Sequence, residues 1–311
     1  GFIAEGVAPV TISAGLSPNP PYNPVVTSAN ISQGVIFRSA TVKVWGVPAA
    51  HSHDEERGDC LNKGKACSVS IPEIPFLTLP TSCESPLAFG FEADSWQQPS
   101  PPGAPYPFGE TVTADDGASP PNPLSPSGCA KLQFAPTIGA QPTARAASSP
   151  TGLDFSLDVA DEGILNPAEG AAAASTIRKA LVTLPEGMTA NPSLAEGLTT
   201  CSEADLARES ASSAPGAGCP AASKIGSIEV ETPLLEEAVK GALYIATPYE
   251  NPFGSLLALY VVLQDEKLGI SVKQPLKVEP DPQTGQLVTV AEDRPQLPFS
   301  HFKLHFREGA R

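Results

Sequence analysis

The segment 51–56 (HSHDEE) holds the densest group of side chains that can do chemistry. In an extended chain, residues two apart share a face, with their Cα atoms about 6.7 Å apart. His51 and His53 would then converge on one metal ion, with Asp54 or Glu55 as an oxygen ligand. The sequence identifies no third ligand elsewhere. A solvated, charged loop is therefore the preferred interpretation, and we expect neither a metal nor another cofactor.

A second group of candidate residues is aromatic. Trp96, Tyr106 and Phe108 flank or lie within a proline-rich tract at residues 97–126, and Tyr22 lies between prolines. Exposed rings can stack on the faces of sugars, so this pattern suggests a carbohydrate-binding platform. The alternative is that Trp45 and Trp96 are core or loop-anchoring residues, because only 6% of the chain is aromatic.

Catalytic motifs are missing from the sequence. It has no Gly-x-Ser-x-Gly elbow, no His-Glu-x-x-His motif and no glycine-rich loop that leads into a helix. A pair of carboxylates for glycoside hydrolysis stays open, because acidic residues are plentiful and the required separation is spatial. We therefore expect that the protein is not an enzyme.

The chain has six cysteines, none of them in a Cys-x-x-Cys pair: Cys60, Cys67, Cys83, Cys129, Cys201 and Cys219. An even number of cysteines in loop-like sequence predicts three disulfides in an oxidising compartment. Six cysteines allow 15 pairings. Pairing of neighbours (60–67, 83–129 and 201–219) is the simplest, and free thiols in a cytosolic protein are the alternative.

The elements that would position these residues are short strands, because 35 prolines exclude long helices. Two-residue alternation and turn signals predict strands rather than helices. The expected strands are 41–45, 153–159, 179–184, 227–232, 242–246, 255–263, 269–278, 286–290 and 299–306. In the last of these, His301 and His305 take the solvent face. The only expected helix is 202–208.

Many short strands with frequent turns predict an all-β fold of two antiparallel, Ig-like β-sandwich modules with long proline-rich loops. The segment 141–150 is rich in small residues and bracketed by prolines, which is typical of a linker. We therefore expect an N-terminal, disulfide-containing β domain at 1–143, with the tract 97–126 as an extended surface loop. A C-terminal β-sandwich is expected at 151–311, truncated relative to the full-length protein.

The charge balance restricts the partners. The chain carries 34 acidic and 19 basic residues, for a net charge of −15. Nucleic-acid binding relies on clustered Lys and Arg, so no nucleic-acid partner is expected. The longest apolar run, 256–263, is far shorter than the roughly 20 residues that span a bilayer, so direct membrane insertion is not expected.

Several long segments resemble recurring segments of large secreted proteins of high-GC actinobacteria. They include 45–48 (WGVP), 75–83 (PFLTLPTSC), 93–97 (ADSWQ), 184–192 (LPEGMTANP), 219–226 (CPAASKIG), 251–260 (NPFGSLLALY) and 281–287 (DPQTGQL). The resemblance covers most of the chain after about residue 30. It implies a cell-surface or extracellular location and a modular β architecture, and it carries over no catalytic residue.

Together these patterns favour an extracellular structural or adhesive protein of the cell surface, whose signal peptide is absent from this chain. Its expected partners are further copies of itself or other surface proteins. The N-terminal segment Gly1–Leu16 alternates in part (Val7, Val10, Ile12). It is therefore our candidate for a strand lent to the sheet edge of a neighbour in a fibre. The alternative function is a carbohydrate-binding module with a glycan ligand.

Overall fold

The computed structural model describes residues 2–4, 8–17, 19–34, 39, 41–57, 70–101, 104–168, 170–190, 199–292 and 294–306. Within these residues the chain is mostly β, and all pairs between its strands are antiparallel. The chain falls into two compact units, one formed by 1–44, 135–165 and 176–311 and the other by 45–134 and 166–175.

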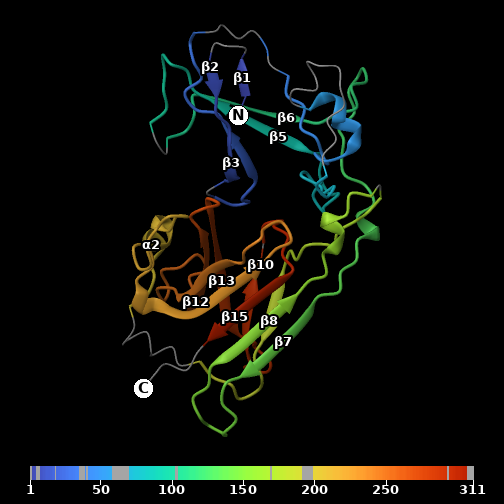
Figure 1. Ribbon diagram of the computed structural model, residues 1–311. Coiled ribbons are helices and arrows are strands. Elements are labelled where there is room, and N and C mark those ends of the chain that lie inside the picture. Colours follow the sequence, from blue (N-terminus) through green and yellow to red (C-terminus); the bar gives the residue numbers. More distant parts are fainter. Residues whose placement is uncertain are drawn as a thin grey trace. The chain divides into compact units, whose positions relative to one another are not determined.

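A curled, nine-stranded antiparallel sheet dominates the first unit (Figure 1). In spatial order its strands are β7 (Thr137–Pro142), β8 (Leu153–Asp158), β15 (His301–Phe306), β10 (Lys224–Glu231), β11 (Val239–Ile245), β12 (Leu257–Asp265), β13 (Ile270–Pro280), β14 (Leu287–Ala291) and β9 (Ala180–Thr183). All of them except β7 overlap strands predicted from the sequence, with somewhat different bounds.

The other strands form two-stranded hairpins. In the first unit, β1 (Phe2–Ala4) pairs with β2 (Ala8–Val10), and β3 (Ser13–Leu16) pairs with β4 (Pro24–Thr27). In the second unit, β5 (Ala88–Ala93) pairs with β6 (Phe108–Thr113). None of these hairpins pairs with a further described strand, and an isolated two-stranded hairpin is only marginally stable in water.

The described helices are all short. They are α2 (Glu203–Arg208) and the 3-10 helices η1 (His51–Glu56), η2 (Cys129–Lys131), η3 (Glu162–Leu165) and η5 (Ala221–Ser223). The helix predicted at 202–208 is confirmed as α2, with Ser202 as its N-cap. Within the described ranges, no helix has the length and apolar character needed to cross a membrane.

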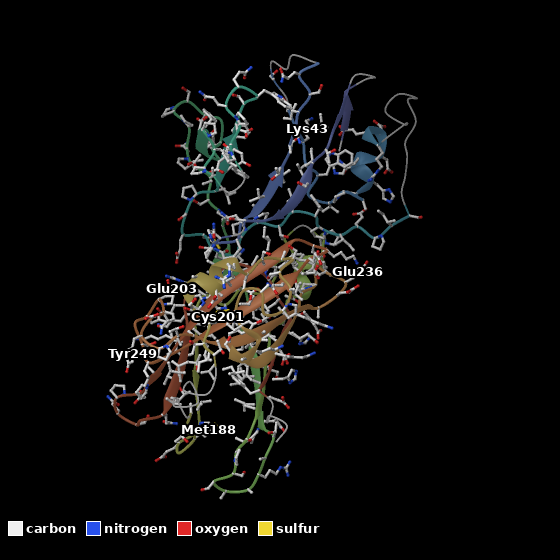
Figure 2. All side chains as sticks on the ribbon, turned by 90° about the vertical axis from the view of Figure 1, so that its left-hand side faces the viewer. Lys43, Met188, Cys201, Glu203, Glu236 and Tyr249 are labelled. Atoms are coloured by element: carbon white, nitrogen blue, oxygen red, sulfur yellow. A yellow bond between two sulfur atoms is a disulfide. The ribbon has the colours of Figure 1, made fainter. Side chains whose placement is uncertain are left out.

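The core of the large sheet lies mainly on the central strands, and its two faces differ. One face carries branched aliphatic side chains, including Leu243 on β11 and Leu259 and Val261 on β12. The opposite, outer face carries Tyr244 and Tyr260, which are paired across β11 and β12. Successive residues of a strand point to opposite faces, so one alternating sequence builds both layers. Side chains accordingly fill the space on both sides of the sheet (Figure 2).

Strand β15 confirms the predicted alternation near the end of the chain. Phe302 and Leu304 pack against the aliphatic core, whereas the histidines lie on the other face. His301 Nδ1 lies 2.5 Å from Asp158 Oδ1, and His305 Nδ1 lies 2.8 Å from Asp154 Oδ1, both across the β8–β15 pair. The two histidines therefore take separate carboxylate partners on the polar face.

Two expectations about domain organisation differ from the structure. The two Ig-like sandwich modules are not confirmed, because nine described strands belong to one sheet. The linker expected at 141–150 is instead the hairpin connection between β7 and β8, where the N–H of Thr143 donates to Gly152 O at 3.1 Å. The compact units consequently differ in their bounds from the predicted domains 1–143 and 151–311.

The strand predicted at 41–45 is wrong. These residues belong to no strand, and Val42 and Val44 are 72% and 56% exposed. An alternating sequence becomes a strand only where a partner offers hydrogen bonds. The expectation of one extended loop at 97–126 is also wrong, because the tract contains β6, which pairs with β5.

We expect the aliphatic core to carry much of the stability of the sheet. Leu243→Ala removes a side chain with 0% exposure and should lower the free energy of unfolding by about 2–5 kcal/mol. Leu181→Ala on β9, where the side chain is 59% exposed, is the matched control and should change it by less than about 0.5 kcal/mol. Urea unfolding measures both, and equal losses would contradict this assignment of the core.

Candidate functional site

The most unusual contact of the first unit joins Tyr22 to the large sheet. Tyr22 lies in the connection between β3 and β4 and is only 1% exposed. Its hydroxyl donates to Lys273 O at 2.6 Å and accepts from the Lys273 N–H at 2.8 Å. One side chain thus bonds both backbone groups of a single residue of β13, 251 residues away in sequence.

This contact falls where β13 lacks a neighbouring strand. β14 pairs with β13 only at residues 277–280, so the earlier part of β13 has no strand partner on that side in the described chain. In an antiparallel strand, the N–H and C=O of one residue point to the same side. Those of Lys273 meet Tyr22 and therefore face the open edge. The Tyr22 hydroxyl replaces the two hydrogen bonds that another strand would make.

The loop that carries Tyr22 is held by its own backbone. The N–H of Ser17 donates to Asn23 O at 2.8 Å, and the N–H of Tyr22 donates to Asn19 O at 3.0 Å. Tyr22 adopts φ 60°, the left-handed conformation that is uncommon for a bulky residue. Burial of the ring and its two hydrogen bonds to β13 offset this backbone strain.

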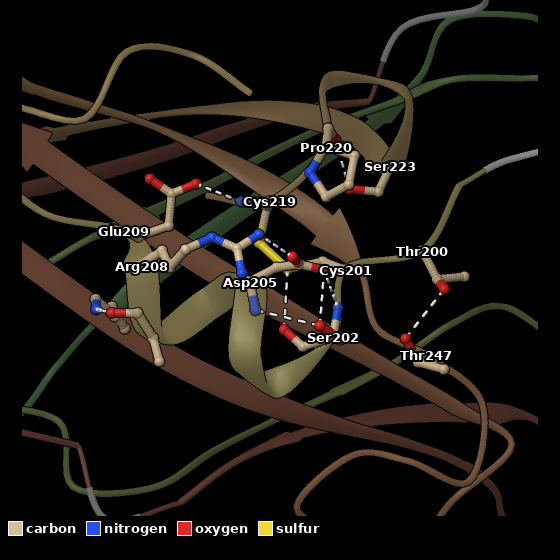
Figure 3. Close-up of a disulfide and its surroundings, with 12 residues drawn as sticks. Thr200, Cys201, Ser202, Asp205, Arg208, Glu209, Cys219, Pro220, Ser223 and Thr247 are labelled. Atoms are coloured by element: carbon tan, nitrogen blue, oxygen red, sulfur yellow. Dashed lines mark hydrogen bonds and ion pairs between the residues drawn. A yellow bond between two sulfur atoms is a disulfide. The ribbon is translucent and has the colours of Figure 1, made fainter. Parts of the chain in front are cut away.

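A disulfide-closed segment packs on the face of the sheet that carries Tyr244 and Tyr260. Figure 3 shows this disulfide and the residues around it. Cys201 and Cys219 are both 0% exposed and pack against Tyr244 and Tyr260. Their bond closes a separation of 18 residues, which stabilises the fold by about 3 kcal/mol on the chain-entropy model. The segment 201–219 is therefore a firm cover for that face.

Helix α2 begins inside this cover with a capping box. The Ser202 hydroxyl accepts the N–H of Asp205 at 3.1 Å, and the Asp205 carboxylate accepts the N–H of Ser202 at 3.0 Å. The Ser202 hydroxyl also donates to Asp205 Oδ2 at 2.7 Å, and this bond, with the one from the Ser202 N–H, holds the pKa of Asp205 below its usual range; Arg208 adds a smaller effect. Reciprocal capping is what lets so short a helix form.

Glu209 joins the cover to β12. Its side chain is 5% exposed, with Oε1 accepting the N–H of Cys219 at 2.7 Å and Oε2 accepting Gln264 Nε2 and the Ser213 hydroxyl, each at 2.7 Å. Gly218 permits this approach, because a Cβ there would lie 2.5 Å from the Glu209 carboxyl carbon. A buried carboxylate with this many donors fixes the position of the cover.

Lys273 connects the cover to the open edge. Its Nζ donates to Ala207 O at 3.1 Å near the end of α2, while its backbone meets Tyr22. Burial lowers the pKa of Lys273, and the nearby Glu209 acts in the opposite direction. Tyr22, β13, α2 and the disulfide thus form one continuous site, which we call the Tyr22 joint (residues 19–23, 270–275 and 201–219).

Comparison of the chain with protein-family models, curated proteins and solved structures found no match. Its function therefore has to be inferred from geometry.

The histidine cluster, the weak metal-site candidate of the sequence, is a short helix in the structure. Residues 51–56 are η1 and not an extended chain, so the imidazoles do not share a strand face. His53 stacks on Trp45 with ring centroids 4.2 Å apart, and His51 Nδ1 lies 3.0 Å from Asp54 Oδ2. That hydrogen bond, with a further one from Arg57, lowers the pKa of Asp54. No group of three candidate metal ligands occurs within the described ranges.

The aromatic candidates separate into two kinds of environment. Trp96, Tyr106 and Phe108 are 55%, 45% and 51% exposed on or near the β5–β6 hairpin. Phe91 on the neighbouring strand was missed, although its ring lies 6.1 Å from that of Phe108. Tyr22, in contrast, is buried and cannot stack on a sugar. The alternation of β5 was the signal that could have found Phe91.

The cysteine pairing agrees with the simplest prediction where the structure describes it. Cys83–Cys129 and Cys201–Cys219 are disulfides, and no described cysteine is free. Cys60 and Cys67 lie outside the described residues.

The candidate donor segment Gly1–Leu16 forms β1, β2 and β3, each paired within the same chain. Val10 is 8% exposed and Ile12 is 39% exposed, while Gly1 and Val7 lie outside the described residues. The segment therefore makes short pairs in this chain, and it leads directly into the loop that carries Tyr22.

Tyr260 gives a pH prediction for this site. Burial, with a smaller effect of Glu203, raises its pKa to about 12. The unfolded chain, with a tyrosine pKa of about 10, loses the proton first, so the free energy of unfolding should fall as the pH rises from about 10 to 12. Tyr260→Phe should make that fall shallower in urea unfolding across this range.

The same variant should leave stability at pH 7 unchanged or raised, because the Tyr260 hydroxyl is buried without a partner among the described residues. Tyr22→Phe is the matched comparison: it leaves two backbone groups of Lys273 unpaired and should cost about 1–3 kcal/mol at pH 7. Equal effects of the two variants at pH 7 would contradict the assigned hydrogen bonds.

Proposed function

We propose that this chain is an extracellular structural or adhesive protein of the cell surface, whose copies assemble by lending the N-terminal segment to the sheet of a neighbour. The observation that carries the proposal is the Tyr22 joint. There the N-terminal hairpin meets an open stretch of backbone on β13 through the Tyr22 hydroxyl. Open strand edges bind added segments through backbone hydrogen bonds, which supply affinity without a dedicated pocket.

The hairpin β3–β4 has the exposed surface that such an assembly needs. Val25 and Val26 on β4 are 43% and 68% exposed, and Ile12 before β3 is 39% exposed. A two-stranded hairpin buries little apolar surface by itself. Docking in an assembly would bury this surface and so contribute to association.

The extracellular location is supported by the cysteines. Two described disulfides persist best in an oxidising compartment. The resemblance of segments such as 184–192 and 281–287 to secreted actinobacterial proteins points the same way. Location at the surface would also suit a disulfide-stabilised sheet as a durable building block.

Deletion of residues 1–16 tests the proposed assembly. It removes β1, β2 and β3, so the hairpin that carries Tyr22 loses its pairing strand. The full chain should form multimers by light scattering coupled to gel filtration and regular assemblies by electron microscopy, and the deletion variant should remain a single chain.

Val42→Ser is the control for this deletion, because it changes an apolar side chain that is 72% exposed and lies outside the hairpins. It should assemble like the full chain. Multimers of unchanged size from the deletion variant would count decisively against strand lending.

A second candidate function is carbohydrate binding by the β5–β6 hairpin. Phe91 and Phe89 share one face of β5, and their cross-strand neighbours include Val112 on β6. Phe89 and Phe91 are 63% and 60% exposed. With Phe108, they give an aromatic surface of the kind that sugar faces stack on, and Trp96 lies just beyond the end of β5.

Glycan-array binding tests this second function. If it holds, the full chain should bind a defined set of glycans, and Trp96→Ala and Phe91→Ala should abolish that binding. Phe76→Ala, at a ring that is 66% exposed outside the hairpin, should leave it unchanged. An array without signal for the full chain would remove carbohydrate binding.

A further inference from the structure

We propose that the open edge of β13 at residues 270–273 is the acceptor site of the assembly, and that Tyr22 of a second copy is the residue that occupies it. This inference rests on the proposed function and names its joint. The contact seen within one chain is then the closed form of the same joint, and assembly exchanges an identical element between copies.

Tyr22 can make the same hydrogen bonds within one chain and between two copies. The Tyr22 hydroxyl bonds the backbone N–H and C=O of Lys273, and each copy presents the same two groups. A hydroxyl that donates and accepts at one residue keeps the same bonds in either arrangement. The exchanged and the closed forms therefore differ little in contact energy, and protein concentration decides between them.

Chain length also permits exchange. The contact joins residues 251 positions apart, and no described strand of the large sheet lies between β4 and β7. Exchange therefore depends on that connection, because the strands from β7 onwards keep the same partners in either form. Tyr22 of the same chain occupies the edge with a finite effective concentration. At a high enough protein concentration, Tyr22 of a second copy can compete with it.

The sequence of the acceptor edge limits how far pairing along it can extend. The Ser271 hydroxyl is buried without a partner among the described residues and lies two residues from Lys273. Pro275, two residues further along, has no N–H to donate. Proline on an edge limits continued pairing, which favours a single defined joint over indefinite strand addition.

Photo-cross-linking in a mixture of isotope-labelled and unlabelled copies of the full chain tests the acceptor site. Asn23, which is exposed and adjacent to Tyr22, is replaced by p-benzoylphenylalanine so that Tyr22 is retained. Nitrogen-15-labelled and unlabelled chains are unfolded together in urea with their disulfides intact, refolded at high concentration and irradiated. Multimers should contain cross-links between a labelled chain and residues 270–275 of an unlabelled chain, and single chains should contain none of these.

Subunit exchange between preformed multimers provides a second readout. Tyr22→Phe weakens the closed and the exchanged joint equally, so the size distribution should stay the same. Opening the joint becomes easier, so mixing of labelled and unlabelled multimers should speed up between about 5-fold and 100-fold. Tyr260→Phe, the matched control for a buried tyrosine, should leave the exchange rate unchanged, because its hydroxyl has no described partner.

The outcomes separate this inference from the proposed function. Multimers whose cross-links to residues 270–275 join only chains of one isotope would overturn the acceptor site and leave assembly through the N-terminal segment standing. An exchange rate unaffected by Tyr22→Phe would also overturn it. A full chain that stays single at every concentration would overturn both.

Discussion

A sheet that does not close on itself leaves backbone N–H and C=O groups unpaired along its edges, and the first unit depends on how those groups are satisfied. The central strands pair along most of their length, but β14 ends before it covers the start of β13. At that gap the Tyr22 hydroxyl bonds both groups of Lys273. The backbone groups of the open edge are thereby hydrogen-bonded by a side chain in place of a strand.

The cover over the outer face makes this edge rigid. Glu209, Gln264 and the Cys201–Cys219 bond fix the segment 201–219 against β12, and Lys273 reaches from β13 to the end of α2. With little helix and few aromatic residues, the chain stabilises this face with a covalent link and a buried, fully bonded carboxylate. The acceptor side of the Tyr22 joint is therefore held by many contacts, whereas Tyr22 itself lies on a two-stranded hairpin of low intrinsic stability.

The sequence predicted local features well and long-range ones poorly. The strands predicted at 255–263 and 269–278 overlap β12 and β13, because short apolar runs bounded by turn residues mark them in the sequence. The segment 41–45 alternates equally well but pairs with no strand among the described residues. The small residues and prolines at 141–150 suit a hairpin connection as well as a linker. The role of Tyr22 depends on a residue 251 positions away, which no local pattern records.

Charge and hydrogen bonding act on assembly in opposite ways. A net charge of −15 makes copies of this chain repel one another, which opposes non-specific association. The Tyr22 joint uses a hydroxyl and two backbone groups, none of which carries a charge at neutral pH. Its geometry can therefore select one contact between copies while the acidic surface disfavours the rest. An open edge is therefore compatible with a defined assembly. Pro275 limits how far strand pairing extends along β13, and charge repulsion disfavours contacts elsewhere on the surface.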